Sequence, residues 1–401
     1  MEMTREQKID ELLTRGVADM IDGERLRERL MRGDELRVKL GIDPTSPNLH
    51  IGRSVVLLKL RDFQELGCKV VLIVGDFTGQ IGDTSDKESE RPMLKSDLIK
   101  ENMRTYTSQL GMLIDLSKAE MHSNSEWLQP LGFDDIGTEA EHFSVAEFIA
   151  RENIKKRLDE GKRVSLREML YPLMQGYDSV AVHADVELGG TDQRFNLLAG
   201  RRLQEAHGQV AQSILMTDLM LGTDGRKMSS SWGNTINLLD TPNNMFGKVM
   251  SIADSMIVPY LIHCTRVPLA EVEVIEAKLF DGELNPRDAK LRLAQEIVTL
   301  YHSTEEGEKA EKYFVETISE KKIPEDIPVT LVNAEQETVV DVLVRMQLAT
   351  SKSDAWRKIE QGGVSIDGEK ISEKDTHLDK TKHHNKALKV GKHGFVRLQF
   401  S

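Results

Sequence analysis

The sequence predicts an α/β protein with a parallel β-sheet in its N-terminal part, followed by an α-helical region and a small α+β domain. Two observations predict the sheet. Residues 70–76 (VVLIVGD) form a continuous apolar run, typical of a strand covered on both faces. Strand-like and helix-like segments also alternate along the chain, joined by loops that contain glycine. This order is typical of parallel α/β sheets, which bind ligands at the carboxyl ends of their strands.

The elements around this first strand follow from their residue patterns. Residues 36–42 (LRVKLGI) alternate apolar and polar side chains, as a strand does. Two prolines and a glycine exclude regular structure from 43–52 (DPTSPNLHIG), and 53–66 (RSVVLLKLRDFQEL) has the pattern of a helix. Residues 179–190 (SVAVHADVELGG) are expected to form a further strand.

The character of the chain changes at Thr241, which with Pro242 is typical of a helix N-cap and a first-turn proline. Helical patterns follow, then two short helices at about 338–348 and 352–360. Residues 364–371 (VSIDGEKI) carry an Asp-Gly turn that predicts a hairpin. The domains expected from these changes are an α/β domain over 1–235, a helical domain over 236–325, a linker over 326–337 and an α+β domain over 338–401.

The chain is acidic, with a net charge of -13, but its charges are unevenly distributed. Residues 341–401 carry 12 basic and 8 acidic side chains, and no acidic residue occurs between Lys380 and Arg397. A basic tail on an acidic body is typical of a protein that binds a polyanion such as RNA, although a solvated basic surface has the same composition.

The composition also narrows the class of protein. No apolar run reaches the roughly 18 residues of a membrane span, and the charged start of the chain lacks the apolar stretch of a secretory signal. Cys68 and Cys264 lie far apart and outside any metal-ligand spacing, so we expect two reduced thiols in a cytoplasmic protein. We therefore expect neither a membrane partner nor a protein-bound metal.

Two segments have residue types suited to polyphosphate. His50 and Gly52 lie at an expected strand-to-helix junction, where free N–H groups and the positive end of the helix dipole attract phosphate. The segment 225–234 (GRKMSSSWGN) places Lys227 among serine hydroxyls, which together offer a positive charge and hydrogen-bond donors. Each segment taken alone also fits an ordinary surface loop.

A polar stripe is expected on one helix. Ser165 and Glu168 form a capping-box pattern, which places a helix start there. Tyr171, Gln175 and Asp178 then share one helical face. A phenol, an amide and a carboxylate on one stripe suit a ligand, although a solvated surface can have the same pattern.

Two further loops contain residues suited to ligand binding. In 189–193 (GGTDQ), two glycines let the backbone approach a ligand, and Asp192 is suited to ribose hydroxyls. Asp83, suited to an ammonium group, precedes the cations Lys87 and Arg91, which suit phosphate.

Taken together and in this order, these segments resemble those of bacterial tyrosyl-tRNA synthetases, which are class I enzymes. The HIGH-type motif reads HIGR at 50–53, and the KMSKS-type motif reads KMSSS at 227–231. The helical stripe followed by Gly-Gly-x-Asp-Gln is shared with this family and its tryptophan-using relatives. The last domain resembles the RNA-binding module first seen in ribosomal protein S-four.

The resemblance implies a Rossmann-like catalytic domain that forms tyrosyl-adenylate from L-tyrosine and ATP with Mg²⁺, and then charges tRNA(Tyr). It also implies a homodimer that pairs through an insertion at 97–160. The catalytic residues it implies are His50, Lys227, Lys87 and Arg91. The ATP-binding residues it implies are Asp43, Thr45, Gly52, Arg53, Gly190, Asp192, Lys227 and Ser230. The tyrosine-binding residues it implies are Lys39, Asp83, Tyr171, Gln175, Asp178 and Gln193. The RNA-binding residues it implies are Lys352, Arg357, Lys358, Lys382, Lys386 and Lys389.

Three positions depart from the family pattern. Arg53 replaces the second histidine of the HIGH motif, and Ser230 replaces the second lysine of the KMSKS motif. We therefore expect Arg53 to restore part of the charge lost at position 230. Lys39 occupies the position of a tyrosine beside the substrate phenol in many family members, which leaves the second contact to the phenol unassigned.

Three alternative functions follow from the same residues. A tryptophanyl-tRNA synthetase has the same class of fold, but Asp178 and the RNA-binding tail favour tyrosine. A non-catalytic RNA-binding paralogue would explain the altered HIGR and KMSSS motifs, although His50, Lys227 and the polar stripe are retained. A nucleotide-binding enzyme unrelated to tRNA would leave the C-terminal module unexplained.

Overall fold

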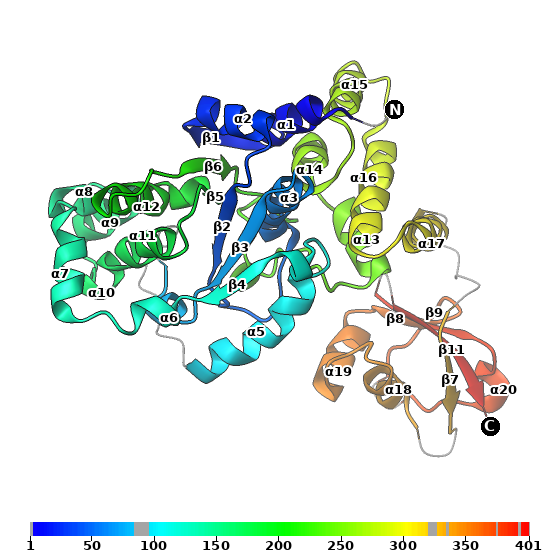
Figure 1. The fold of residues 1–401 in the computed structure, drawn as a ribbon. Coiled ribbons are helices and arrows are strands. Elements are labelled where there is room, and N and C mark those ends of the chain that lie inside the picture. The colour runs from blue at the N-terminus through cyan, green and yellow to red at the C-terminus, as the bar shows by residue number, and fades with distance from the viewer. Residues whose placement is uncertain are drawn as a thin grey trace. The chain divides into compact units, whose positions relative to one another are not determined.

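The computed structural model describes residues 3–83, 96–319, 327–333, 337–373, 376–391 and 394–400. They form two compact units (Figure 1). The first unit contains residues 1–240 and 251–296, and the second contains 241–250 and 297–401. The region that we expected as a helical domain, 236–325, therefore contributes residues to both units.

A six-stranded sheet, in the order β1-β6-β5-β2-β3-β4, forms the centre of the first unit. All neighbouring pairs from β6 to β4 are parallel, which confirms the predicted α/β class, whereas β1 pairs antiparallel with β6. The sheet is therefore mixed rather than wholly parallel. No residue pattern predicted the antiparallel edge strand. Its strands are β1 (Val17–Ile21), β2 (Arg37–Ile42), β3 (Lys69–Val74), β4 (Glu120–Ser123), β5 (Val186–Gly190) and β6 (Ser213–Thr217).

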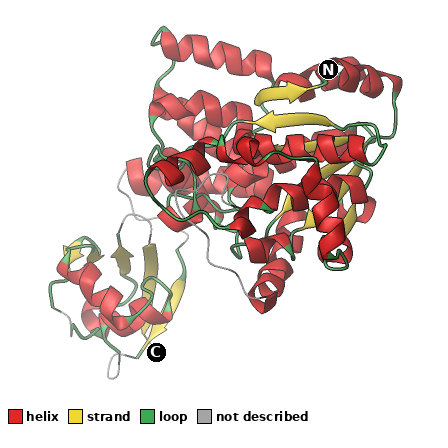
Figure 2. Ribbon diagram, turned by 90° about the vertical axis from the view of Figure 1, so that its left-hand side faces the viewer, coloured by secondary structure: helices red, strands yellow, loops and turns green. Residues whose placement is uncertain are grey.

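Helices cover this sheet, and Figure 2 shows its strands lying among them. Helix α3 packs against β2, β3 and β5, while α12 packs against β5 and α11. This cover explains why residues 70–74 of β3 are continuously apolar and buried. The helices that begin in the first unit are α1 (Arg5–Thr14), α2 (Gly23–Arg32), α3 (Ile51–Glu65), α4 (Thr78–Ile81), α5 (Ser96–Leu110), α6 (Ser125–Leu128), α7 (Phe133–Glu141), α8 (Val145–Ile149), α9 (Glu152–Asp159), α10 (Leu166–Met169), α11 (Tyr171–Ala181), α12 (Arg194–Ala206), α14 (Ile257–Cys264), α15 (Leu269–Phe280) and α16 (Pro286–Tyr301).

The expected strand at 179–190 is wrong in its first half. Residues 179–181 end helix α11, and only 186–190 form strand β5. A short apolar run fits either a buried helix end or a strand, and here the helical period of the preceding stripe continues through Ser179, which is fully buried. The predicted helix start is confirmed, because Ser165 and Glu168 form a capping box at the start of α10.

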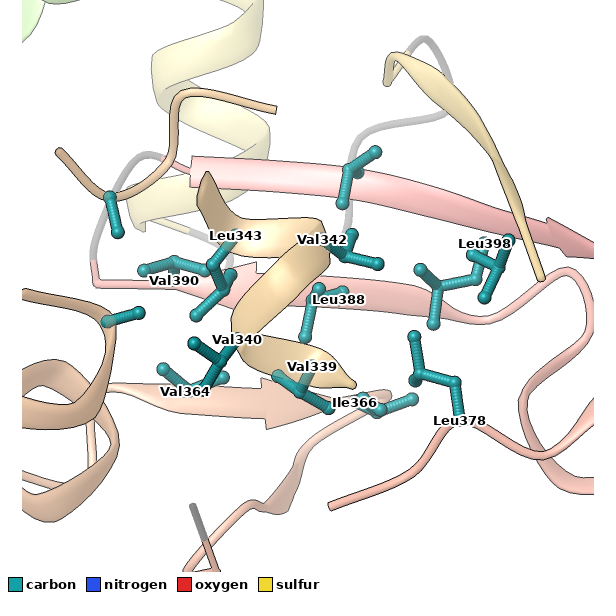
Figure 3. Close-up of a cluster of buried hydrophobic side chains, with 14 of the residues drawn as sticks. Val339, Val340, Val342, Leu343, Val364, Ile366, Leu378, Leu388, Val390 and Leu398 are labelled. Carbon is teal, nitrogen blue, oxygen red and sulfur yellow. The ribbon is translucent and has the colours of Figure 1, made fainter. Parts of the chain in front are cut away.

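The second unit contains a five-stranded sheet in the order β7-β11-β10-β8-β9. Its valine- and leucine-rich helix α18 packs over this sheet, and Figure 3 shows Val339, Val340, Val342 and Leu343 among buried strand residues. Its strands are β7 (Val329–Val332), β8 (Val364–Ile366), β9 (Glu369–Lys370), β10 (Ala387–Val390) and β11 (Gly394–Phe400). Its helices are α13 (Pro242–Met250), α17 (Thr304–Phe314), α18 (Val339–Arg345), α19 (Lys352–Glu360) and α20 (Lys380–His383).

Two expectations for this region are confirmed and one is wrong. Helix α19 has the predicted bounds, and Asp367 and Gly368 both have positive φ at the turn of the predicted hairpin. The expected linker at 326–337, in contrast, contains β7, which pairs in parallel with β11. Its alternate side chains Thr330 and Val332 are buried, a pattern too short to be recognised in the sequence.

No single helix within the described ranges is both long and apolar enough to cross a membrane, and only the bent pair 242–250 and 254–264 passes that test together.

Candidate active site

A cavity of about 510 Å³ opens at the carboxyl ends of the parallel strands, where the fold class predicts a ligand. Residues that follow β2, β3, β5 and β6 line it, together with residues of α3, α11 and the 227–231 segment. The described residues that we assigned to catalysis, ATP or tyrosine line this cavity, with the exception of Lys39. They are Asp43, Thr45, His50, Gly52, Arg53, Asp83, Tyr171, Gln175, Asp178, Gly190, Asp192, Gln193, Lys227 and Ser230. Lys87 and Arg91 lie outside the described residues.

His50 is the N-cap residue of α3 and is buried at one end of the cavity. Burial, together with the positive charges of Arg53 and Lys227, lowers the pKa of its imidazole to about 3. His50 is therefore neutral at physiological pH and has one N–H to donate. A Cβ at Gly52 would lie 3.1 Å from the His50 ring and 3.2 Å from the sulfur of Met228, so a side chain would crowd this end.

Arg53 is held beside His50 by two hydroxyl groups. It donates to the hydroxyl of Tyr106 at 2.8 Å and to the Thr45 hydroxyl at 3.3 Å. Tyr106 is fully buried in α5, and no pattern in the sequence identified it. The guanidinium therefore remains in place as a fixed positive charge.

The 222–234 segment presents Lys227 to the same end. The Lys227 ammonium lies 3.2 Å from the Asp192 carboxylate. The buried amide of Asn234 closes the base of the segment, because it accepts from the Ser229 backbone and donates to Asp224 and to the Lys227 carbonyl. Asn234 belongs to the predicted motif segment, but its role depends on contacts that the sequence does not show.

The predicted stripe on α11 also lines the cavity. The Tyr171 hydroxyl donates a hydrogen bond to the Asp43 carboxylate at 2.8 Å. Gln193 donates to Asp83 at 2.7 Å. The Asn196 amide donates to the side-chain oxygens of Gln175, at 3.1 Å, and Gln193, at 3.0 Å. Because of these bonds, these polar groups are already oriented.

Asp178 is 3% exposed and accepts a hydrogen bond from the Trp127 indole at 2.8 Å and from the Asn124 amide at 3.4 Å. Burial raises the pKa of Asp178 and outweighs the charge of Lys39 and these two hydrogen bonds, which act to lower it, so the pKa is about 7. Asn124 also lines the cavity. Both partners follow β4, a strand that no residue pattern predicted, so no signal pointed to them.

Lys39 does not have the role that we expected. Its ammonium group donates to the Glu187 carboxylate at 2.8 Å, the Ser179 hydroxyl at 2.7 Å and the Gln175 carbonyl at 2.9 Å. A lysine ammonium has three N–H groups, so these contacts use all of them. The assignment of Lys39 to direct tyrosine binding is therefore wrong in this structure.

The side chains assigned to RNA binding lie on the small α+β part of the second unit. Lys352 pairs with Asp341 at 2.9 Å, while Lys358 pairs with Asp354 at 3.0 Å and donates to the Leu348 carbonyl. The remaining members differ in their contacts and exposure. They are Arg357, which pairs with Asp354, Lys382 and Lys386, which are exposed or partly exposed, and Lys389, whose ammonium lies 5.3 Å from the centre of the Phe395 ring.

No group of three or more His, Cys, Asp or Glu side chains within the described ranges is arranged to hold a metal ion. An ion that enters the cavity with a phosphate ligand would not need such a group, since Mg²⁺ keeps several waters and is usually held by substrate phosphates with one or two carboxylates.

Comparison with known proteins identifies the family. Residues 31–319 match the family model of class I tRNA synthetases (W and Y), and 319–396 match a tyrosine–tRNA ligase SYY-like C-terminal domain. The tyrosine–tRNA ligase of Thermotoga maritima is 44% identical over 397 residues, which cover 99% of this chain and 98% of the relative. That of Symbiobacterium thermophilum is 46% identical, over 96% of both chains.

Solved structures have the same fold. The tyrosyl-tRNA synthetase of Archaeoglobus fulgidus, complexed with L-tyrosine, has a TM-score of 0.60 at 23% identity and covers 77% of this chain and all of its own. A C-terminally truncated mitochondrial tyrosyl-tRNA synthetase of Coccidioides posadasii has a TM-score of 0.61 at 22% identity, over 76% of this chain and 91% of its own. The resemblance inferred from the motifs is thus confirmed, and the chain belongs to the tyrosine–tRNA ligase family of class I aminoacyl-tRNA synthetases.

Proposed function

We propose that the cavity activates L-tyrosine with ATP and that the tyrosyl group is then transferred to the 3′ end of tRNA(Tyr). In the first step a tyrosine carboxylate oxygen attacks the α-phosphorus of ATP, the bond to the bridging oxygen breaks, and pyrophosphate leaves. In the second step a terminal ribose hydroxyl of the tRNA attacks the tyrosyl carbonyl, and AMP leaves. Neither step needs a bond to the protein, so its residues act by position and charge.

One observation carries this proposal. A single cavity is lined both by the buried carboxylate of Asp178 and by the cations Arg53 and Lys227, with His50. The carboxylate suits a phenolic hydroxyl, and the cations suit a polyphosphate. Tyrosine has the phenolic hydroxyl and ATP has the polyphosphate, so this pair of ligands matches both parts of the lining.

At the phosphate end, charge and hydrogen bonding stabilise the transition state. Neutral His50 donates to a phosphate oxygen, while Arg53 and Lys227 offset the negative charge that develops there. Mg²⁺ would enter the site with the ATP substrate and would add positive charge at its phosphates. The adenylate ribose and base are held by Asp43, Gly190 and Asp192, by Gly52 at the adenine, and by the hydroxyls of Thr45 and Ser230. Lys87 and Arg91 are proposed to contact the departing pyrophosphate.

At the tyrosine end, the ammonium group lies between Asp83, Tyr171 and Gln175, and Gln193 lies near the carboxylate. Asp178 accepts a hydrogen bond from the phenolic hydroxyl. Phenylalanine would leave this buried carboxylate without that donor, which is costly. Since the Lys39 ammonium is fully engaged elsewhere, Asn124 replaces it as our candidate for the second contact to the phenol.

The chain is proposed to act as a homodimer that pairs through residues 97–160. Large apolar side chains of this segment are exposed, among them Phe133 at 94% and Val145 at 71%. Exposed apolar side chains on one segment suit a subunit interface. The tRNA would then contact the helical region 236–325 and the α+β part 338–401.

We place this activity in the cytoplasm. Cys68 and Cys264 are both free and buried, which suits a reducing compartment.

The test is amino-acid-dependent exchange of pyrophosphate into ATP, measured separately with tyrosine, tryptophan and phenylalanine. At equal concentration we expect exchange with tyrosine to be far faster than exchange with either of the other two. Exchange with tryptophan would assign the chain to the sister specificity. Absence of exchange with all three would favour an RNA-binding protein without catalysis.

A further inference from the structure

We propose that Glu187, paired with Lys39, is a positioning residue that turns the side-chain oxygen of Gln175 toward the cavity and thereby builds the acceptor for the tyrosine ammonium group. This inference rests on the proposed placement of that ammonium group. It assigns a function to a buried ion pair that neither contacts the cavity nor belongs to a recognised motif.

The pair is fully removed from solvent. The Lys39 side chain is 0% exposed and that of Glu187 is 1% exposed. Two charges at such a depth are costly to desolvate, so a buried ion pair of this kind needs good geometry and further hydrogen bonds. The further hydrogen bonds are present, because each remaining N–H of Lys39 has an acceptor.

The direction of each hydrogen bond around Glu187 is determined by chemistry. A carboxylate only accepts, so every neighbour must donate to it. Ser179 donates at 3.1 Å, the Gln212 amide donates to the same oxygen, and the Gln175 amide nitrogen donates at 3.1 Å to the oxygen that Lys39 contacts. Because the nitrogen of Gln175 faces Glu187, its side-chain oxygen faces away from Glu187.

A second carboxylate orients the neighbouring amide in the same way. Gln193 donates its nitrogen to Asp83, so its oxygen points to Asn196. Asn196 donates to that oxygen and to the oxygen of Gln175. Thus Glu187 and Asp83 lie at opposite ends of one chain of amides, and both amide oxygens face its middle.

Tyr171 completes the set. It donates its proton to Asp43 and keeps its phenolic oxygen as an acceptor. Asp83, Gln175 and Tyr171 all line the cavity, and they carry a carboxylate, an amide oxygen and a hydroxyl oxygen, respectively. All three are acceptors, which suits a group with three N–H donors. A reversed Gln175 amide would place a donor against the ammonium group instead.

The experiment compares two double variants that remove both charges, so that neither leaves an unpaired buried ion. In K39M/E187M no acceptor remains for the Gln175 nitrogen. In K39M/E187Q the amide oxygen at position 187 still accepts from it. Pyrophosphate exchange gives KM for tyrosine and for ATP. Inhibition gives Ki for tyrosinol, which has the ammonium group, and for 3-(4-hydroxyphenyl)propanoate, which lacks it. Thermal unfolding checks that both variants are folded.

We expect K39M/E187M to raise KM for tyrosine and Ki for tyrosinol by about 10- to 100-fold, as for loss of a hydrogen bond to a charged group. KM for ATP and Ki for the propanoate should change less than about twofold, within the range of an unaffected site. K39M/E187Q should recover most of the affinity for tyrosine. Equal weakening of both inhibitors, equal losses in both variants, or no loss in K39M/E187M would each overturn the inference. If the unmodified chain does not exchange with tyrosine, the proposed function itself fails.

Discussion

At the scale of single residues, burial sets the charge state at the two ends of the cavity. Burial lowers the pKa of His50 to about 3 and raises that of Asp178 to about 7. In both cases burial disfavours the charged form, so the imidazole is neutral and the carboxyl group titrates near neutral pH. Ionised Asp178 acts only as a hydrogen-bond acceptor for the phenolic hydroxyl, whereas the protonated carboxyl group also carries an O–H donor.

This titration predicts a pH-dependent preference for tyrosine over phenylalanine. Because the pKa of Asp178 is raised, its carboxylate form predominates above pH 7 and is lost as the pH falls below that value. The ratio of kcat/KM for tyrosine to that for phenylalanine should therefore rise between pH 5.5 and 8, by at most about tenfold per pH unit. Steady-state exchange assays over this range measure it.

The matched control is Asp178→Asn, whose amide does not titrate. This variant should show a low ratio that is flat with pH. His50 remains neutral throughout the range and adds no slope. A flat ratio in the unmodified chain, or a pH-dependent ratio in the variant, would contradict the assignment of Asp178 to the phenol.

At the scale of elements, the site residues are positioned by where the helices begin and by the contacts between helices. Helix α10 begins at a capping box, and its Glu168 also forms a buried ion pair with Arg157 of α9 at 2.6 Å. Helix α11 follows directly and directs its stripe into the cavity. Helix α5 contributes Tyr106, whose hydroxyl holds Arg53 at the first turn of α3.

This link between α3 and α5 predicts that Arg53 compensates for the serine at position 230. Arg53→His should lower kcat/KM for ATP in pyrophosphate exchange by about 10- to 100-fold, as loss of a charged hydrogen-bonding group does. Ser230→Lys should restore part of that loss in the double variant, because the new lysine supplies a cation at the same end. The coupling comes from a double-mutant cycle, and simple additivity would refute compensation.

Tyr106→Phe is the matched control for positioning. It removes only the hydroxyl that holds Arg53 and leaves the charge in place. We expect a smaller loss in kcat/KM for ATP than for Arg53→His, with KM for tyrosine unchanged. A variant that weakens tyrosine and ATP equally would show that Tyr106 acts on stability rather than on Arg53.

At the scale of the whole molecule, charge is divided along the chain. The net charge is -13, yet six basic residues and no acidic ones occur from Lys380 to Arg397. Several basic side chains of this part already pair with acidic neighbours, as Lys352 does with Asp341. Exposed side chains such as Lys382 are therefore better candidates for contacts to a phosphate backbone.

The RNA-binding role predicts a salt-dependent effect at Lys382. Lys382→Glu should raise KM for tRNA in aminoacylation, and the slope of log KM against log salt should fall by about one for each phosphate that the side chain no longer neutralises. Exchange of pyrophosphate without tRNA should not change. The matched control is Lys8→Glu, an exposed lysine of α1 with the same change in charge. Equal effects of both variants would indicate a general field rather than a direct interaction with the RNA.

Much of the site could be predicted from the sequence because its motifs are local. The spacing of Tyr171, Gln175 and Asp178 depends only on the helical period, and the HIGR and KMSSS segments are continuous in the chain. The fold class was predictable for the same reason, since buried strands and intervening helices have short-range patterns. These features were determined by the sequence alone.

Only the tertiary structure decided which distant residues meet. Strand β1 joins the sheet antiparallel, β7 pairs with β11, and Trp127 reaches Asp178. Lys39 was assigned to the substrate, but its ammonium is engaged by Glu187. The physical reason is that such contacts depend on chain closure and on packing, which leave no periodic signal in the sequence. A lysine in a solvated loop and a lysine in a buried ion pair are the same letter, and only their surroundings distinguish them.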